Sequence, residues 1–187
     1  MSVAYFKRYK MELKLDRIAI ELAPATDMQI QFIPWAPRLL HRHAEIKWQS
    51  FRNELDSHVF PCLGEYEGCL QLMKEISSRQ NFVPQATWLA CRTSEFSGRP
   101  QACGTIQGLM ASPKEGAIQN IGVHPDCRDM GIGTGLLMKA LSGFKEAGCR
   151  FVNLEVTVQN AAAIRLYERI GFQHVETVFK VAEVEMA

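Results

Sequence analysis

The sequence predicts a mixed α/β fold in a single domain. Short segments with alternating apolar residues, the pattern of strands, are interleaved with longer segments in which apolar residues return every three or four positions, the pattern of amphipathic helices. The chain has 187 residues, of which 47% are hydrophobic, and this is enough for one substantial core. No internal repeat, low-complexity tract or long linker divides the chain, so we expect one domain over residues 1–187.

The first half of the chain is expected to form opening strand material followed by two helices. Residues 11–22 alternate well enough for one or two strands, and Pro24 breaks that pattern. Residues 37–55 and 65–77 carry apolar side chains at helical spacing, and Pro61 lies between the two segments. These patterns predict two successive helices after the opening strand.

Strands and helices alternate in the second half. Strands are expected over residues 86–93, 102–110 and 117–123, with a turn at residues 97–100 between the first two. The remaining expected elements are a helix that ends before Gly148, a strand over residues 151–158, a helix over residues 161–170 between Asn160 and Gly171, and closing strand material from Phe172 onward.

Three glycines, Gly131, Gly133 and Gly135, stand at alternate positions between a predicted strand and a predicted helix. Such an entry leaves several backbone N–H groups unpaired at the positive end of the helix dipole, which favours a phosphate, and Arg128 and Thr134 add a charge and a hydroxyl. The spacing departs from the P-loop and from the dinucleotide-binding G-x-G-x-x-G motif. Glycines that open a helix without any ligand are the alternative.

Charge balance and residue spacing exclude several classes of partner. Twenty-one Lys and Arg face 20 Asp and Glu, so no net charge indicates a nucleic-acid or membrane partner. The six cysteines lack a C-x-x-C pair and the spacing of a zinc module, and we expect no metal. His41 and His43 point in different directions on a helix and are expected on its solvated face. Without a membrane-spanning run or signal peptide, we expect a soluble cytoplasmic protein.

Two motifs resemble those of one enzyme family. Arg128 to Gly133 has the spacing R-x-x-G-x-G, and Asn160 to Phe172 resembles the run N-x-x-A-x-x-x-Y-x-x-x-G-F. Together, in this order, they resemble the signatures of the GNAT family of N-acetyltransferases, over about residues 101–172. The resemblance implies a central, mostly antiparallel, splayed sheet flanked by helices. It also implies an acetyl-CoA-binding core over residues 86–187, with opening strand material and acceptor-side helices over residues 1–85.

The family resemblance also implies how the chain binds acetyl-CoA. The strand ending at Val123 is expected to pair with the pantetheine arm, and the amides between Arg128 and Thr134 to hold the pyrophosphate. Asn160 is expected to reach the pantetheine, or only to cap its helix. The implied cofactor-binding residues are Ile121, Gly122, Val123, Arg128, Asp129, Met130, Gly131, Ile132, Gly133, Thr134 and Asn160.

Two residues are implied in catalysis. Tyr167 matches the family tyrosine that protonates the departing CoA thiolate, although it also fits a core stripe with Ala163 and Ile170. Glu155 interrupts the apolar alternation of its strand and matches a glutamate base in the ribosomal-protein alanine N-acetyltransferase branch of the family, which this segment most resembles. A structural ion pair is the equally weighted alternative for Glu155.

The resemblance implies direct acetyl transfer from acetyl-CoA to an amine, either a small molecule or a peptide amino terminus. The acceptor is expected near residues 35–66 and 173–181, without nucleic acid, membrane or metal, and a homodimer is one option for the assembly. A CoA-binding sensor or regulatory module without turnover is the alternative function.

Overall fold

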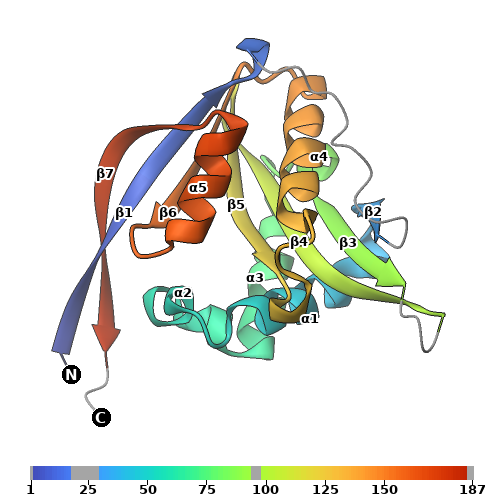
Figure 1. Ribbon diagram of the computed structural model, residues 1–187, viewed down its shortest axis with the longest axis horizontal. Helices are drawn as coiled ribbons and strands as arrows, with labels where there is room; N and C mark the ends of the chain where they lie inside the picture. The colour runs from blue at the N-terminus through green and yellow to red at the C-terminus, as the bar shows by residue number, and fades with distance from the viewer. Residues whose placement is uncertain (1, 18–29, 94–97, 185–187) are drawn as a thin grey trace.

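Seven strands form one sheet in the computed structural model, which describes residues 2–17, 30–93 and 98–184 (Figure 1). The sheet order is β2-β3-β4-β5-β6-β1-β7, and every neighbouring pair is antiparallel except β5 and β6. The predicted mixed α/β fold with a mostly antiparallel sheet is therefore confirmed. The strands are β1 (Ser2–Lys14), β2 (Ile30–Pro34), β3 (Trp88–Thr93), β4 (Pro100–Ser112), β5 (Glu115–Val123), β6 (Phe151–Thr157) and β7 (Gln173–Val184).

Helices cover both faces of the sheet. The α-helices are α1 (Leu40–Phe51), α2 (Leu55–Val59), α3 (Tyr66–Ser78), α4 (Ile132–Glu146) and α5 (Ala161–Ile170), and short 3-10 turns include η2 (Pro37–Leu39), η4 (Pro84–Ala86) and η5 (Pro125–Cys127). A Cβ at Gly104 of β4 would touch Ile132 and Leu136 of α4, whereas the next residue, Thr105, bonds to α1. Because successive strand residues face opposite sides, α1 and α4 lie on opposite faces.

The first strand differs from the expectation. It begins at Ser2 and ends at Lys14, whereas residues 11–22 were predicted; residues 18–22 and Pro24 lie outside the described residues. Burial in β1 does not follow residue polarity, because the aromatic Tyr5 is 71% exposed whereas the charged Arg8 is 7% exposed. The strand also lies between β6 and β7, so a segment from the start of the chain completes the far side of the sheet.

Most other predicted elements are confirmed with boundary shifts of a few residues. The alternation in β6 buries Val152, Leu154 and Val156 in the main core against α4 and α5, as expected. The helix predicted over residues 37–55 is divided into η2 and α1, and α2 begins only at its last residue. The turn expected at residues 97–100 lies partly outside the described residues.

Close backbone approach fixes α4 against η4. A Cβ at Gly143 would lie 1.9 Å from the carbonyl oxygen of Gln85, so only glycine allows this contact. The helix begins at the predicted phosphate loop, and this contact therefore helps to place the loop.

We expect Gly143→Ala to lower the free energy of unfolding by about 1–3 kcal/mol or more, because a methyl group there must displace rigid backbone. Urea denaturation measures the loss. Gly64→Ala is the matched control, since its Cβ would have an ordinary contact of 3.8 Å. Equal stabilities of the two variants would contradict the close-approach argument.

Candidate active site

The sheet opens between β5 and β6. These strands pair only through Glu115–Phe151, Gly116–Val152 and Ala117–Asn153. Beyond this point β5 stays paired with β4 as far as Val123, and β6 stays paired with β1. A bulge in β5, where Gln107 faces Asn120 but Gly108 faces Ile118, begins just after the last shared pair. Bulges bend the strand that carries them, so β5 changes course at the point where its pairing with β6 ends.

The open edge of β5 carries unpaired backbone groups. The N–H of His124 donates to Cys103 of β4, at 2.9 Å. Because N–H groups of a strand point alternately to its two sides, those of Ile121 and Val123 point away from β4 and into the opening. Gly122 serves packing, since a Cβ there would lie 2.9 Å from the Cβ of Ser50 on α1.

The loop before α4 presents free amides beside this opening. Gly131 caps the helix with a φ of 76°, and Asp129 is the only other loop residue with positive φ. The first helical hydrogen bond runs from the N–H of Gly135 to the carbonyl of Gly131. In the part of the chain that the structure describes, no hydrogen bond uses the backbone N–H groups of residues 129–134. An anion fits this helix end without displacing a protein acceptor.

Glycine is favoured at each of the three loop positions for a different structural reason. Gly131 adopts the left-handed conformation that glycine favours. A Cβ at Gly133 would lie 3.2 Å from Leu166, a tight contact, whereas one at Gly135 would lie 2.2 Å from the ring of Phe32. Gly135 is thus required by packing, and only the first two glycines belong to the loop's exposed turn.

Arg128 is engaged with protein groups. Its guanidinium forms an ion pair with Glu54 at 2.8 Å and donates to the carbonyl of Ser50 at 3.4 Å, and its backbone N–H donates to Pro125. The side chain therefore joins the loop to the end of α1. Its expected contact with a pyrophosphate stays a prediction.

Asn160 caps α5. Its side-chain oxygen accepts a hydrogen bond from the N–H of Ala163 at 3.2 Å, which confirms the predicted cap. Asn160 is also exposed, and the predicted contact with pantetheine stays untested.

Tyr167 projects from α5 into the core. The residue is 6% exposed and its ring lies edge-on to Phe172 at 5.9 Å. Burial raises the pKa of its phenol well above the ordinary value; the negative charge of Asp56 raises this pKa further, and Arg8 opposes the rise. The hydroxyl has no hydrogen-bond partner among the described residues. It is a protonated donor that a ligand in the opening can use.

Glu155 lies on the opposite face of β6 from the main core. Its carboxylate pairs with the Nε of Arg8 at 3.4 Å, and about half of its side chain is exposed. The structural ion pair, which was the alternative hypothesis for Glu155, is thus present with Arg8. Because the carboxylate is also accessible to solvent, the role of Glu155 as a catalytic base stays a prediction.

Sequence reasoning missed a buried polar row between α1 and the sheet. The expectation that His43 lies on a solvated face is wrong: it is fully buried and its Nδ1 lies 2.8 Å from the Oγ1 of Thr105. Lys47 is also fully buried and donates to the Oδ1 of Asn120 on the splayed part of β5, at 3.0 Å. The spacing of four between the two residues marks one helix face, but their polarity indicated solvent.

Burial lowers the pKa of both groups. The pKa of His43 falls to about 3, with the charges of Lys47 and Arg42 contributing. The pKa of Lys47 falls to about 7, partly opposed by the Cys69 and Cys62 thiols. The α1 side of the opening is therefore held by groups that resist protonation.

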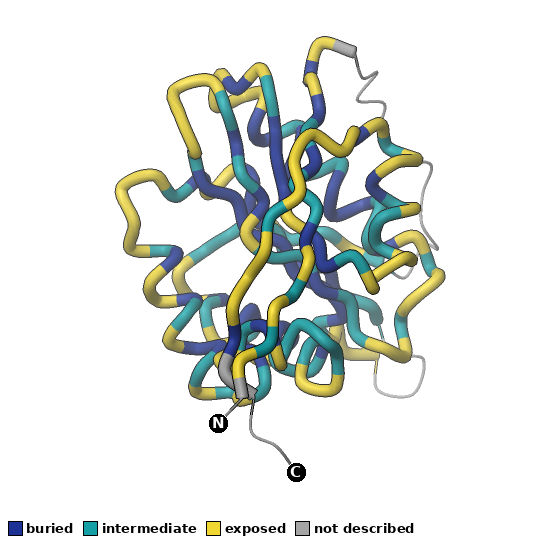
Figure 2. The backbone as a smooth tube through the Cα atoms, turned by 90° about the vertical axis from the view of Figure 1, so that its left-hand side faces the viewer, coloured by how far each residue is buried: buried dark blue, intermediate teal, exposed yellow. Residues whose placement is uncertain are grey.

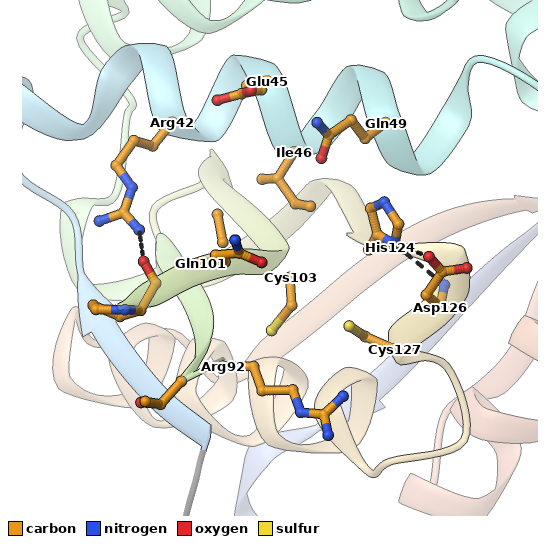
Figure 3. A pocket seen from close by; sticks show the side chains of 13 residues that line it. Arg42, Glu45, Ile46, Gln49, Arg92, Gln101, Cys103, His124, Asp126 and Cys127 are labelled. Atoms are coloured by element: carbon orange, nitrogen blue, oxygen red, sulfur yellow. Dashed lines mark hydrogen bonds and ion pairs between the residues drawn. The ribbon is translucent and has the colours of Figure 1, made fainter. Parts of the chain in front are cut away.

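A pocket of about 660 Å³ lies next to the loop but outside the opening (Figure 3). It is lined by α1, β3, the start of β4 and η5, and none of the predicted site residues lines it. Cys103 and Cys127 approach each other at its floor (Figure 3). Burial raises the pKa of Cys103 to about 12, so this thiol stays protonated and is a weak nucleophile.

The opened sheet beside a helix with free amides is the architecture of acyl-CoA N-acyltransferases. The chain belongs to the acetyltransferase (GNAT) family, whose model matches residues 40–172. No helix within residues 2–17, 30–93 and 98–184 is long and apolar enough to cross a membrane.

Individual relatives match parts of the chain or its fold. An uncharacterized N-acetyltransferase of Methanocaldococcus jannaschii is 48% identical over 61 residues, which are 33% of this chain and 27% of the relative. A GCN5-related N-acetyltransferase from Sphaerobacter thermophilus superposes with a TM-score of 0.68 at 23% identity, over 96% of this chain and 52% of that one. The Escherichia coli ribosomal-protein-S18-alanine N-acetyltransferase superposes with a TM-score of 0.59 at 16% identity, over 84% and 96%. The chain thus spans only about half the length of the Sphaerobacter structure.

The buried lysine predicts how stability depends on pH. The unfolded chain keeps the Lys47 proton up to about pH 10.5, whereas the folded chain releases it near pH 7, so the free energy of unfolding should rise between these values. His43 acts in the same direction between about pH 3 and 6.5, so stability falls as acid is added.

Lys47→Met should raise stability at pH 6 and flatten the rise above pH 7, measured by urea denaturation across that range. The exposed Lys74→Met is the control and should keep the wild-type slope. An unchanged slope in Lys47→Met would show that Lys47 ionises normally in the folded protein.

Proposed function

We propose that the chain is an acetyl-CoA-dependent N-acetyltransferase that transfers the acetyl group directly to an amine. One observation carries the proposal: the unpaired edge of β5 ends beside the unpaired amides that begin α4. The unpaired edge of β5 suits an extended ligand arm that contains amides, because such an arm can pair with it like an added strand. The unpaired amides that begin α4 suit a diphosphate. Membership of the GNAT family supports the same ligand.

Different residues would bind the pantetheine arm and the pyrophosphate of acetyl-CoA. Ile121 and Val123 would pair with the pantetheine arm, and the amides of Ile132, Gly133 and Thr134 would hold the pyrophosphate. Arg128, Asp129, Met130 and Gly131 would shape the loop around it, Gly122 would keep α1 close, and Asn160 would line the pantetheine channel.

Acetyl-CoA, when bound, supplies a thioester carbonyl that an amine can attack. The N–H of Val123 would face the negative charge that develops on the carbonyl oxygen. Tyr167 would donate its proton to the departing thiolate, and its burial keeps that proton in place beforehand. Glu155 would accept a proton from the amine through water, because its exposed carboxylate lies on the α2 side of β6.

The acceptor would enter between the α1–α2 region and β7, and is a small-molecule amine or a peptide amino terminus. The fold shared with the ribosomal-protein-S18-alanine N-acetyltransferase supports the second class. A non-catalytic CoA sensor remains the alternative, because the ion pair with Arg8 gives Glu155 a structural role that needs no catalysis. A cytoplasmic setting, independence of metal, and a homodimer stay predictions.

Ligand binding tests the loop. Acetyl-CoA at a hundred times its Kd should add about 2.7 kcal/mol to the free energy of unfolding, whereas ATP and NAD should add less. Gly131→Val should weaken acetyl-CoA binding at least about tenfold, because a β-branched residue disfavours its φ of 76°. Gly64→Ala is the control. Stabilisation by ATP or NAD but not by acetyl-CoA would sink the proposal.

Acetyl transfer tests the catalytic residues. With an acceptor found by screening amines and peptides for the mass gain of one acetyl group, Tyr167→Phe and Glu155→Gln should each lower kcat by about 10²–10⁴-fold. Both should retain affinity for CoA. Tyr5→Phe and Glu67→Gln alter exposed residues and serve as matched controls. Full activity in both catalytic variants would remove these assignments, and absence of any transfer by the wild type would favour the sensor.

A further inference from the structure

A buried arginine from the first strand joins three separate elements at the acceptor side of the opening. Nη1 of Arg8 donates to the Oγ1 of Thr157 at 2.9 Å and lies 3.5 Å from the Oδ1 of Asp56 on α2. Nε lies 3.4 Å from the carboxylate of Glu155, and Nη2 donates to the carbonyl of the same residue at 3.2 Å. In Figure 1, α2 lies near the end of β6 and beside the β1–β7 ribbon.

Asp56 keeps one oxygen free in this arrangement. Its Oδ1 accepts a hydrogen bond from Thr157 at 3.0 Å and pairs with Arg8. Its Oδ2 has no hydrogen-bond partner within the described ranges, and its side chain is 19% exposed. A carboxylate oxygen has two acceptor positions, so Oδ2 can accept from a ligand while Oδ1 holds the side chain in place.

Tyr167 shares the surroundings of Asp56. After burial, the charge of Asp56 does most to raise the pKa of the phenol, and Arg8 is the group that opposes it; Glu155 does not contribute. The Tyr167 hydroxyl and Oδ2 of Asp56 thus lie close enough for their charges to interact across the opening, and neither has a hydrogen-bond partner among the described residues. A polar ligand group at this point would satisfy both.

Asp56 is the less exposed of the two carboxylates that pair with Arg8. Its side chain is 19% exposed against 49% for Glu155, and Lys10 lies directly opposite Glu155 on β1. Phe60 covers Arg8, with the guanidinium 4.9 Å from the ring centroid. Lys180 approaches the same ring at 5.4 Å but is exposed, so solvent screens its charge. The free oxygen of Asp56 is therefore the acceptor at this corner that is least exposed to solvent, and a carboxylate oxygen can only accept hydrogen bonds, as an ammonium group requires.

We propose that Asp56 binds the ammonium group of the acceptor through Oδ2 beside Tyr167, and that Arg8 is the positioning residue that fixes Asp56. This inference rests on the proposed acetyltransferase function and narrows its acceptors to amines that are protonated before they react. The bound ammonium then gives one proton to Glu155 through water, and the neutral amine attacks. Aliphatic amines and peptide amino termini meet this requirement, whereas aromatic amines, which are neutral at pH 7, do not.

Alaninamide is the test ligand, because it presents the amine of a peptide amino terminus. We expect Asp56→Asn to weaken alaninamide binding in the presence of CoA about 10- to 100-fold, measured by NMR titration, since a hydrogen bond to a charged group is worth about 1.5–3 kcal/mol. Affinity for CoA should be unchanged. Asp16→Asn, which alters an exposed carboxylate beside Leu15, is the matched control and should bind alaninamide like the wild type.

Steady-state kinetics provide the second readout. Asp56→Asn should raise the KM of an aliphatic acceptor about 10- to 100-fold with kcat within a few-fold, whereas Glu155→Gln should act mainly on kcat. Arg8→Lys, which keeps the charge but loses the fork, should raise the KM less than Asp56→Asn does. A merely structural ion pair would lower stability in both variants and leave the KM unchanged.

The outcomes separate the two proposals. Equal alaninamide affinity in Asp56→Asn and Asp16→Asn overturns the inference, as does a wild type that binds or acetylates only neutral aromatic amines. Loss of alaninamide binding in Asp56→Asn, together with no acetyl transfer by the wild type, supports the amine site and overturns the proposed activity. Should Arg8→Lys fail to fold, Asp56→Asn still decides, because it is isosteric.

Discussion

Where β5 leaves β6, each strand keeps a partner on its other edge, and this constraint holds the sheet open. β4 follows β5 through the bulge as far as Val123, and β1 follows β6 as far as Thr157. Closing the opening would require β5 to lose its bulge, and with it the register that pairs Gln107 with Asn120. The gap is consequently a stable part of the fold and remains available to an extended ligand.

The two sides of the opening differ in chemistry. On the α4 and α5 side, the surroundings are apolar apart from free amides and the Tyr167 hydroxyl. On the α1 and α2 side, buried polar groups support the strands, and Lys47 holds Asn120 where β5 has already left β6. Backbone donors thus face one end of a ligand, while side-chain charges gather where an amine would arrive. Such a division suits a reaction between an anionic donor and a cationic acceptor.

Local patterns predicted the elements whose polarity agrees with their burial. The alternation in β6, the cap at Asn160 and the stop at Gly171 are all confirmed, because each depends on neighbouring residues alone. Free amides before α4 follow from the glycine spacing for the same reason, although Gly135 proved to serve packing.

The rest depended on contacts between distant parts of the chain. His43 was predicted on a solvated face and Lys47 carried no prediction, since nothing near them in the sequence shows that Thr105 and Asn120 will satisfy them. Arg8 and Asp56 gave no signal for a related reason: their partners lie on β6, about a hundred or more positions away. Strands β1 and β7 also carry large apolar residues that are exposed, namely Val3, Tyr5, Val175, Phe179 and Val181. Exposed residues recur along both strands in Figure 2.

The place of β1 between β6 and β7 has a consequence for biosynthesis. β1 leaves the ribosome before either of its neighbours in the sheet, β6 and β7, has been translated. Until then the backbone groups of β1 lack their native partners and hydrogen-bond to water. The contacts of Arg8 with Glu155 and Thr157 can form only after β6 has been made, so the charged corner of the opening is completed late.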